Sequence, residues 1–170
     1  MPASDDLERL YDAHAPSLYA FALTLTHREA DSRDLLQDLF VKLARQPDVL
    51  NRVDDERAFL LRWIRNAAVD LFRRRQSREH LGEALAEQIA SPFAPAADAD
   101  DQAFRAALAE ALFELPEEQR AIVQLKLWEG MTFDAIAQLL EIPLNTAASR
   151  YRYGLDKLRH RLRPLYEELR

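Results

Sequence analysis

Apolar side chains recur along this sequence at the spacing of amphipathic helices. In the first segment they fall on one helical face at intervals of three, four and seven residues: Leu7, Tyr11, Leu18, Phe21 and Leu25. The spacing predicts a helix, with a break near Pro16 because proline cannot donate a backbone hydrogen bond. A second helix is expected from about Ala30 to the residue before Pro47.

A third helix is predicted over residues 56–76, after a loop over residues 47–56 that holds no aromatic side chain. The apolar face of this helix is expected to contain Phe59, Leu60, Trp63, Ala67 and Leu71. Because Trp63 shares this face, we expect it to lie in the core rather than to stack on a base. With the broken first helix, four helical pieces precede residue 79.

Residues 79–104, in the middle of the chain, are rich in small and acidic side chains and include proline. This composition predicts a linker. Two short helices are expected after it, over residues 104–115 and 117–128. Gly130 follows the second of them and is a plausible residue to end it in a left-handed conformation.

The predicted fold class is all-α, with one small helical domain over residues 1–78 and a second over residues 105–170, joined by the acidic linker. A net charge of −6 is unusual for a protein that binds nucleic acid, but the excess lies in the linker. Residues 79–104 hold 6 acidic and no basic residues, whereas each domain is neutral. Arginines cluster within the domains, seven of them between Arg57 and Arg78, so local basic surfaces remain available.

A helix-turn-helix is predicted near the C-terminus. Thr132 is a candidate N-cap for a short helix, in which Ala137 leaves room for another helix to approach. A turn over residues 141–144 follows, and Asn145 or Thr146 is expected to cap the next helix. The inward face of that helix is apolar and consists of Ala147, Tyr151, Leu155, Leu158 and Leu162. A short helix, a tight turn and a longer helix that begins with polar residues form the helix-turn-helix pattern.

The outward face of the longer helix carries side chains that can read DNA. Arginine can donate two hydrogen bonds to guanine, asparagine can pair with adenine, and serine can bond to a base or a phosphate. The candidate contacts are Asn145, Thr146, Ser149, Arg150, Arg152 and Tyr153. The alternative is an ordinary helical hairpin with a solvated basic face.

Composition argues against several other classes of protein. There is no cysteine, and the four histidines are scattered, which predicts neither a disulfide nor a metal centre. No glycine-rich phosphate loop or nucleophile–base arrangement appears, so we expect no catalytic residues, no cofactor and no enzyme. The apolar runs fall short of the roughly 20 residues that cross a bilayer, and the N-terminus lacks a signal-peptide pattern, which predicts a cytoplasmic protein.

Three runs in the C-terminal part resemble region 4 of the bacterial sigma-70 family, in its extracytoplasmic-function (ECF) group. They are Leu115–Arg120, Glu129–Ala137 and Ile142–Arg150. The resemblance implies a scaffold helix and a recognition helix that reads the −35 promoter element as duplex. Glu141 stands where the family usually has glycine, which implies a strained turn. Ala148 stands where it usually has lysine or arginine, which implies one phosphate contact fewer.

The run Asp34–Phe40 resembles region 2.2 of the same family, a helix that docks on the clamp helices of the polymerase β′ subunit. A helix over this run presents Asp34, Gln37 and Asp38 outward, and this acidic face suits a basic partner. The inward side chains are expected to be Leu36, Leu39, Phe40 and Leu43. Taken alone, these residues also fit an ordinary solvated helix face.

Residues 62–75 resemble regions 2.3 and 2.4, which hold the −10 element as a melted single strand. Single-strand capture needs cations along the backbone and a place for an extruded base. The resemblance assigns the base to the loop over residues 47–56. It assigns the strand to Arg62, Arg65, Asn66, Arg73, Arg74 and Arg75.

These resemblances cover nearly the whole chain and imply a sigma factor, the subunit that directs RNA polymerase core to promoters. The implied partners are the core enzyme, contacted at its β′ clamp helices and β flap, promoter DNA, and an anti-sigma factor. The acidic linker is expected to occupy the path of the nascent RNA. The alternative is a helix-turn-helix regulator that does not act as a polymerase subunit, although residues 1–78 show no ligand-binding or phosphoacceptor domain.

Overall fold

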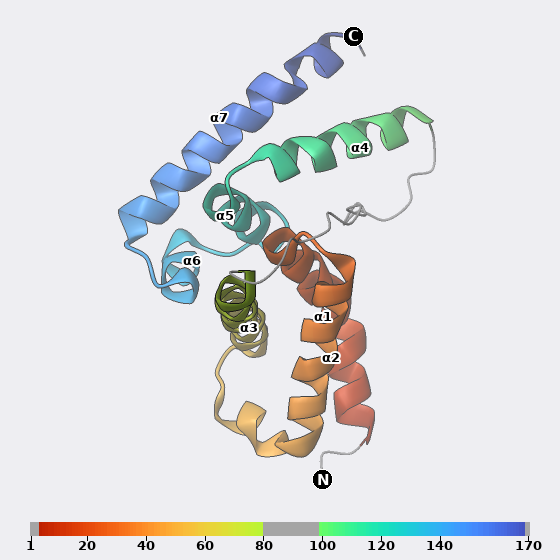
Figure 1. Cartoon of the computed structure of the whole chain (residues 1–170), viewed down its shortest axis with the longest axis vertical. Helices are drawn as coiled ribbons and strands as arrows, with labels where there is room; N and C mark the ends of the chain where they lie inside the picture. The colour runs from red at the N-terminus through yellow and green to blue at the C-terminus, as the bar shows by residue number, and fades with distance from the viewer. Residues whose placement is uncertain (1–3, 80–98, 169–170) are drawn as a thin grey trace. The chain divides into compact units, whose positions relative to one another are not determined.

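The computed structural model describes residues 4–79 and 99–168, and every regular element within these ranges is a helix. The chain divides into two compact units, Met1–Ala90 and Ser91–Arg170 (Figure 1). The predicted all-α fold class is therefore confirmed. Each unit has buried apolar side chains of its own.

The first unit contains three α-helices and a short 3-10 helix. In chain order they are α1 (Ser4–Thr26), α2 (Glu29–Arg45), η1 (Pro47–Arg52) and α3 (Glu56–Glu79). Helix α1 packs along both α2 and α3, so the three apolar faces share one core (Figure 1). The largest fully buried side chains in it are Leu18, Phe21, Leu23, Leu39, Leu60, Leu61 and Ile64.

Helix α1 is continuous, so the predicted break at Pro16 is wrong. A proline in a helix interior removes a backbone hydrogen bond and costs about 3 kcal/mol or more. Burial of the neighbouring Ala15 and Leu18 offsets this cost. Tyr11 was predicted on the buried face, yet it is 50% exposed, and Leu10 lies in the core instead. The first turns of α1 therefore present an aromatic side chain at the surface.

Helix α3 buries a face that shares Leu60 with the predicted one but is rotated toward Leu61 and Ile64. The buried side chains are Leu60, Leu61, Ile64 and Ala68. The first turns of this helix are apolar around most of their circumference, so spacing alone does not select the buried stripe; contact with α1 and α2 selects it. Trp63 is partly buried, and the Lys42 ammonium of α2 lies 5.9 Å from the centre of its ring, so Trp63 lies at the edge of the core.

The second unit contains four α-helices. They are α4 (Ala99–Glu114), α5 (Glu117–Leu127), α6 (Phe133–Leu140) and α7 (Leu144–Glu168). Helix α7 packs against the other three (Figure 1). Its predicted inward stripe is confirmed: Ala147 and Leu158 are buried, and Tyr151, Leu155 and Leu162 pack beside them.

The start of α4 changes the predicted boundary of the linker. Residues 79 and 99–104 were expected to belong to the linker. Residue 79 instead ends α3, and residues 99–104 form the first turns of α4. Helix formation there continues the amphipathic pattern that the sequence shows from Phe104 onward. The rest of the predicted linker, residues 80–98, lies outside the described residues.

The first helix of the helix-turn-helix begins at the predicted cap, but the second begins earlier than predicted. Thr132 caps α6, because its hydroxyl oxygen accepts a hydrogen bond from the Ala135 amide at 3.1 Å. Helix α7 begins at Leu144, and the Pro143 carbonyl accepts hydrogen bonds from the amides in the first turn. Asn145 and Thr146 therefore lie inside the helix, and the prediction that one of them caps it is wrong.

Glu141 ends α6 in a left-handed conformation, with a φ of 57°. This conformation costs an L-residue roughly 1–2 kcal/mol, whereas glycine adopts it without strain. The predicted strain at this position is therefore present in the backbone. The amide of Ile142 donates to the Ala137 carbonyl at 3.0 Å, which holds the turn closed despite the strain.

Glu141→Gly is expected to stabilise the second unit. Relief of the backbone strain is partly offset by the greater entropy of glycine in the unfolded chain, so the expected gain is about 0.5–1 kcal/mol in the free energy of unfolding. Chemical denaturation followed by circular dichroism measures it. Glu141→Ala is the control, because it removes the carboxylate but keeps the strained Cβ. An equal gain from both variants would show that the carboxylate, not the backbone, is responsible.

Candidate nucleic-acid interface

The first turns of α7 present a polar surface. Asn145, Arg152 and Tyr153 are exposed, and Thr146 and Ser149 are half-buried. The Arg152 guanidinium lies 5.3 Å from the centre of the Tyr153 ring, within cation–π range, so each side chain restricts the other. The Ser149 hydroxyl donates to the Thr146 carbonyl at 3.1 Å. Five of the six residues predicted to contact the −35 element thus share one accessible surface.

Arg150, the sixth of these residues, is turned toward another helix. Its Nη2 atom lies 2.7 Å from Oε2 of Glu118, in the first turn of α5. The Arg150 side chain is 29% exposed and the Glu118 side chain 65% exposed. Glu118 was not among the predicted residues. The pair joins two helices that are distant in sequence, so no local pattern identifies it.

Arg120 fixes the junction between α4 and α5. It is buried, its Nη2 atom donates to the Leu115 carbonyl at 3.0 Å, and its guanidinium lies 5.6 Å from the centre of the Phe113 ring. Burial lowers the pKa of Arg120 to about 10, against the opposing effect of the Glu117 carboxylate. The guanidinium therefore stays charged at neutral pH. Its hydrogen bond holds the start of α5, the turn that carries Glu118, in place.

In the first unit, α3 carries a polar stripe of the predicted −10 residues. Arg62, Asn66 and Arg73 are separated by four and seven residues, which places them on one side of the helix, and all three are exposed. Arg65 lies beside Asn66, and its Nη1 atom donates to the side-chain Oδ1 of Asn66 at 3.1 Å. Arg74 is also exposed, and its Nε atom donates to the backbone one turn earlier.

Arg75 has a different environment from the other predicted −10 residues. It follows Ala68 by seven residues, and therefore lies on the buried side of α3. Its Nη2 atom donates a short hydrogen bond to Asp31 at the start of α2, and the Asp31 side chain is only 10% exposed. The second Asp31 oxygen lies 3.9 Å from Nε of Arg28. The Arg75 guanidinium thus joins α3 to α2, which distinguishes it from the other predicted −10 residues.

The loop predicted to hold an extruded base forms η1. None of the η1 side chains is buried. A hollow of about 180 Å³ lies between η1 and α1, and its lining includes Leu10, Pro47, Leu50 and Asn51. No aromatic ring lines this hollow. A base that entered it would be held by shape and hydrogen bonds rather than by stacking.

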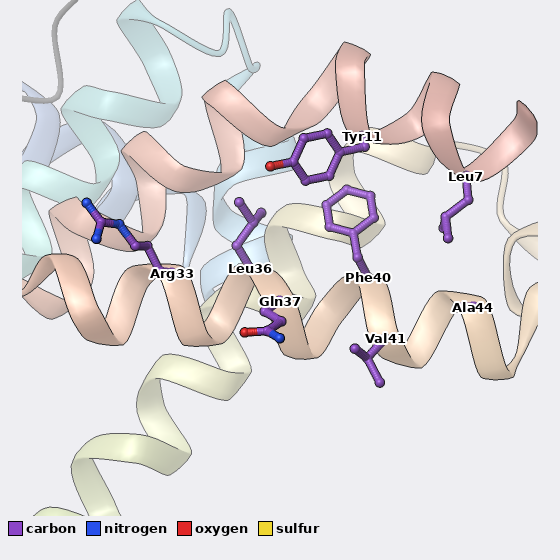
Figure 2. Close-up of a pocket in the computed structure, with 8 residues that line it drawn as sticks. All are labelled: Leu7, Tyr11, Arg33, Leu36, Gln37, Phe40, Val41 and Ala44. Atoms are coloured by element: carbon purple, nitrogen blue, oxygen red, sulfur yellow. The ribbon is translucent and has the colours of Figure 1, made fainter. Parts of the chain in front are cut away.

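The predicted polymerase-docking residues lie on the surface of α2, beside a groove. Asp34, Gln37 and Asp38 are exposed, and neither aspartate has an ion-pair partner within the described residues. The groove runs between α1 and α2 and has a volume of about 450 Å³ (Figure 2). Its lining is mostly apolar and consists of Leu7, Tyr11, Arg33, Leu36, Gln37, Phe40, Val41 and Ala44.

Several apolar side chains that line the groove are exposed or only partly buried. The rings of Tyr11 and Phe40 meet edge to face, with their centres 5.0 Å apart (Figure 2). Val41 is 40% exposed, and Leu36 is half-buried although it was predicted to face the core. Leu35 is buried in its place. Arg33 is the only charged side chain among the described residues of this lining, and the exposed carboxylates of Asp34 and Asp38 lie on the same helix outside it. An apolar groove of this kind fits the apolar face of a partner helix.

Within residues 4–79 and 99–168, no group of three or more histidine, aspartate or glutamate side chains is arranged to hold a metal ion. No helix in the same ranges is long and apolar enough to cross a membrane.

A helix-turn-helix with a polar recognition surface, together with an arginine-faced helix in a second unit, defines a DNA-binding protein of transcription. The family profile of sigma-70 region 2 matches residues 10–78, and that of sigma-70 region 4 matches residues 105–158. The ECF RNA polymerase sigma factor SigL of Mycobacterium tuberculosis is 31% identical over 161 residues, which cover 94% of this chain and 90% of that protein. This chain belongs to the sigma-70 family, in its ECF group.

Further similarities agree with this assignment. The RNA polymerase sigma factor CarQ of Myxococcus xanthus is 30% identical over 167 residues, covering 98% of this chain and 95% of that protein. The fold matches that of the sigma factor RpoE from Bartonella quintana, with a TM-score of 0.74 at 24% identity over 93% of this chain and 97% of that one. The chain is thus a promoter-specificity subunit of RNA polymerase, not an enzyme and not a regulator that acts apart from polymerase.

Proposed function

We propose that residues 1–78 dock on RNA polymerase core and hold the −10 element, and that residues 105–170 read the −35 element. The observation that carries the proposal is the exposed polar surface on the first turns of α7, within a helix-turn-helix. Sequencing the DNA that the reconstituted holoenzyme binds tests it. Enriched fragments should share two elements at a constant spacing. Enrichment of a single element would contradict the division of labour.

Docking is assigned to the exposed polar residues of α2 and to the apolar groove between α1 and α2. Asp34 and Asp38 supply negative charge, Gln37 supplies an amide for hydrogen bonds, and the groove beside them can bury apolar side chains. The β′ clamp helices are the proposed occupant, since a basic helical partner complements both features. The β flap is the proposed second contact on the core enzyme, made by residues 105–170.

Capture of the −10 strand is assigned to the exposed stripe of α3. Arg62, Arg65, Asn66, Arg73 and Arg74 can follow a single-stranded backbone. The hollow beside η1 is the proposed place for an extruded base. Arg75 contributes indirectly, because its bond to Asp31 sets the position of α3 against α2.

Two further proposals follow from the family. The solved structures of RpoE and CnrH are complexes, the first with the anti-sigma factor NepR and the second with the cytosolic domain of CnrY. An anti-sigma factor is therefore a proposed partner of this chain as well. The proposed location is the cytoplasm, where RNA polymerase transcribes DNA.

Arg152→Ala is expected to weaken binding to the preferred −35 duplex by about 1–3 kcal/mol and to relax discrimination at one base pair, because arginine reads a base edge. Ala148→Lys is the contrasting variant. A lysine there should add a phosphate contact, which steepens the salt dependence of binding by about 0.9 in log–log slope without changing the preferred sequence. Binding to a panel of duplexes across a salt titration measures both effects. If both variants change affinity equally for all sequences, Arg152 does not read a base.

A further inference from the structure

Glu118 occupies a position that the promoter-reading role of α7 does not explain. It is an acidic side chain in the first turn of α5, and its carboxylate bonds to Arg150 on the recognition helix at 2.7 Å. A carboxylate next to a DNA-binding surface repels the phosphate backbone. Its presence there calls for a function other than direct contact with DNA.

Of the two arginines in the first turns of α7, Arg150 forms an ion pair with a carboxylate, whereas Arg152 forms none with any described residue. Arg152 stacks on Tyr153 and has no carboxylate partner within the part of the chain that the structure describes. Arg150 is neutralised by Glu118, and its side chain is 29% exposed against 76% for Arg159 farther along the same helix. The recognition surface of the free protein thus shows less positive charge than its sequence contains.

The ion pair can be exchanged for a contact with DNA. Its glutamate is 65% exposed, and ion pairs with such solvent access are weak. The partial positive charge at the start of α5 stabilises the Glu118 carboxylate after Arg150 leaves it. Arginine also has five N–H donors in a planar fork, so the same guanidinium can pass from a carboxylate to a phosphate.

We propose that Glu118 restrains non-specific DNA binding by holding Arg150 until the recognition helix is seated on its −35 element. This inference rests on the proposed function, because it requires Arg150 to contact promoter DNA. Binding to arbitrary DNA depends almost entirely on phosphate contacts, so neutralising one arginine weakens it most. Binding to the preferred element adds base contacts that draw Arg150 toward the backbone. The result is a larger ratio of specific to non-specific affinity.

Glu118→Gln is expected to increase the affinity of the full-length chain for a mixed-sequence duplex about five-fold and to steepen the salt dependence by about 0.9 in log–log slope, the effect of one added phosphate contact. Affinity for a duplex that carries the −35 element should rise less. Fluorescence anisotropy between about 50 and about 200 mM KCl measures both. Circular dichroism confirms that the variant is folded.

Glu167→Gln is the matched control, because it removes an equal charge from another exposed ion pair on α7, that with Arg163. It should leave the mixed-sequence affinity within two-fold, as expected for a charge away from the recognition surface. Glu118→Gln combined with Arg150→Ala should lose the gain seen with Glu118→Gln alone. A gain that survives Arg150→Ala would overturn the proposal, since the effect would then be general electrostatics.

The two proposals can fail separately. If Arg150→Ala leaves binding to the −35 duplex unchanged, the assignment of Arg150 to promoter DNA fails, and the inference about Glu118 fails with it. If Arg150→Ala weakens that binding while Glu118→Gln does not raise mixed-sequence affinity, only the inference about Glu118 fails. A Glu118→Gln variant that loses promoter affinity as Arg150→Ala does would show that Glu118 positions Arg150 instead of restraining it.

Discussion

Replacing Asp38 with arginine is expected to lower the affinity for RNA polymerase core by about 100-fold or more, while the protein stays folded. Asp38 is exposed on α2, beside the groove, and has no ion-pair partner within the described residues. Substitution at such a position changes stability by only about 0.5 kcal/mol. A basic partner would meet a like charge instead of an opposite one, and such a contact costs several kcal/mol. Competition with the wild-type chain for purified core measures the loss.

The control for this prediction is Glu167→Arg, which changes the charge equally at an exposed position on α7. It should lower core binding much less than Asp38→Arg does, because Glu167 is not part of the proposed clamp-helix dock. Asp38→Asn should give a smaller loss than Asp38→Arg, since it removes attraction without adding repulsion. Unchanged core binding by Asp38→Arg, with a normal circular dichroism spectrum, would show that the dock lies elsewhere.

Gly154→Val is expected to destabilise the second unit by about 3 kcal/mol, because overpacking a tight interface forces side chains and backbone to move. Gly154 lies inside α7, where it faces α5. A Cβ atom at this position would lie 2.9 Å from Cγ2 of Val123, which is fully buried, and 3.5 Å from Cβ of Gln119. Valine adds two more carbons to this contact. Chemical denaturation measures the loss, and binding to the −35 duplex should fall with it.

A double-mutant cycle tests the cause of this effect. Gly154→Ala alone places a methyl group against Val123, while Val123→Ala alone leaves a cavity. Together the two changes should cost less than the sum of their separate effects by about 0.5–3 kcal/mol, the usual range of coupling between contacting residues. Additive losses would show that the two helices do not depend on this close approach.

The elements of the fold could be predicted from the sequence more reliably than the faces that they bury. Helix ends near Pro47 and Pro116, and the cap at Thr132, follow from local chemistry, and the structure agrees. The buried face of α3 does not, because Leu60, Trp63 and their neighbours are apolar around the helix. Which of them is buried depends on the neighbours of α3.

The exposed apolar residues of the first unit show the same limit in another form. Tyr11 and Leu36 have the spacing of core residues. A sequence pattern cannot distinguish a residue buried in the core from one that lines a surface groove. The difference depends on how closely α1 and α2 approach each other. In this chain they leave the groove open at the residues that resemble the family's polymerase dock.

Two arginines differ from the other candidate DNA-contacting residues because each forms an ion pair with a residue distant in sequence. Arg75 and Arg150 have the same local character as their neighbours, yet each bonds to an acid on another helix, Asp31 and Glu118 respectively. Arg75 would have been recognised from sequence if the buried face of α3 had been known, since it lies seven residues after Ala68. No comparable signal exists for Arg150, because the position of α5 against α7 is set by the packing around Gly154 and Val123.

The presence of a separate buried core in each unit has a consequence for how such proteins diversify after gene duplication. If the exposed face of α7 reads the −35 element as proposed, a copy that accumulates changes there would alter its choice of promoter while α1, α2 and α3 keep their packing. A substitution confined to one core leaves the buried contacts within the other core unchanged. New regulons can then arise by small steps, in lineages that never lose the ability to engage the same polymerase.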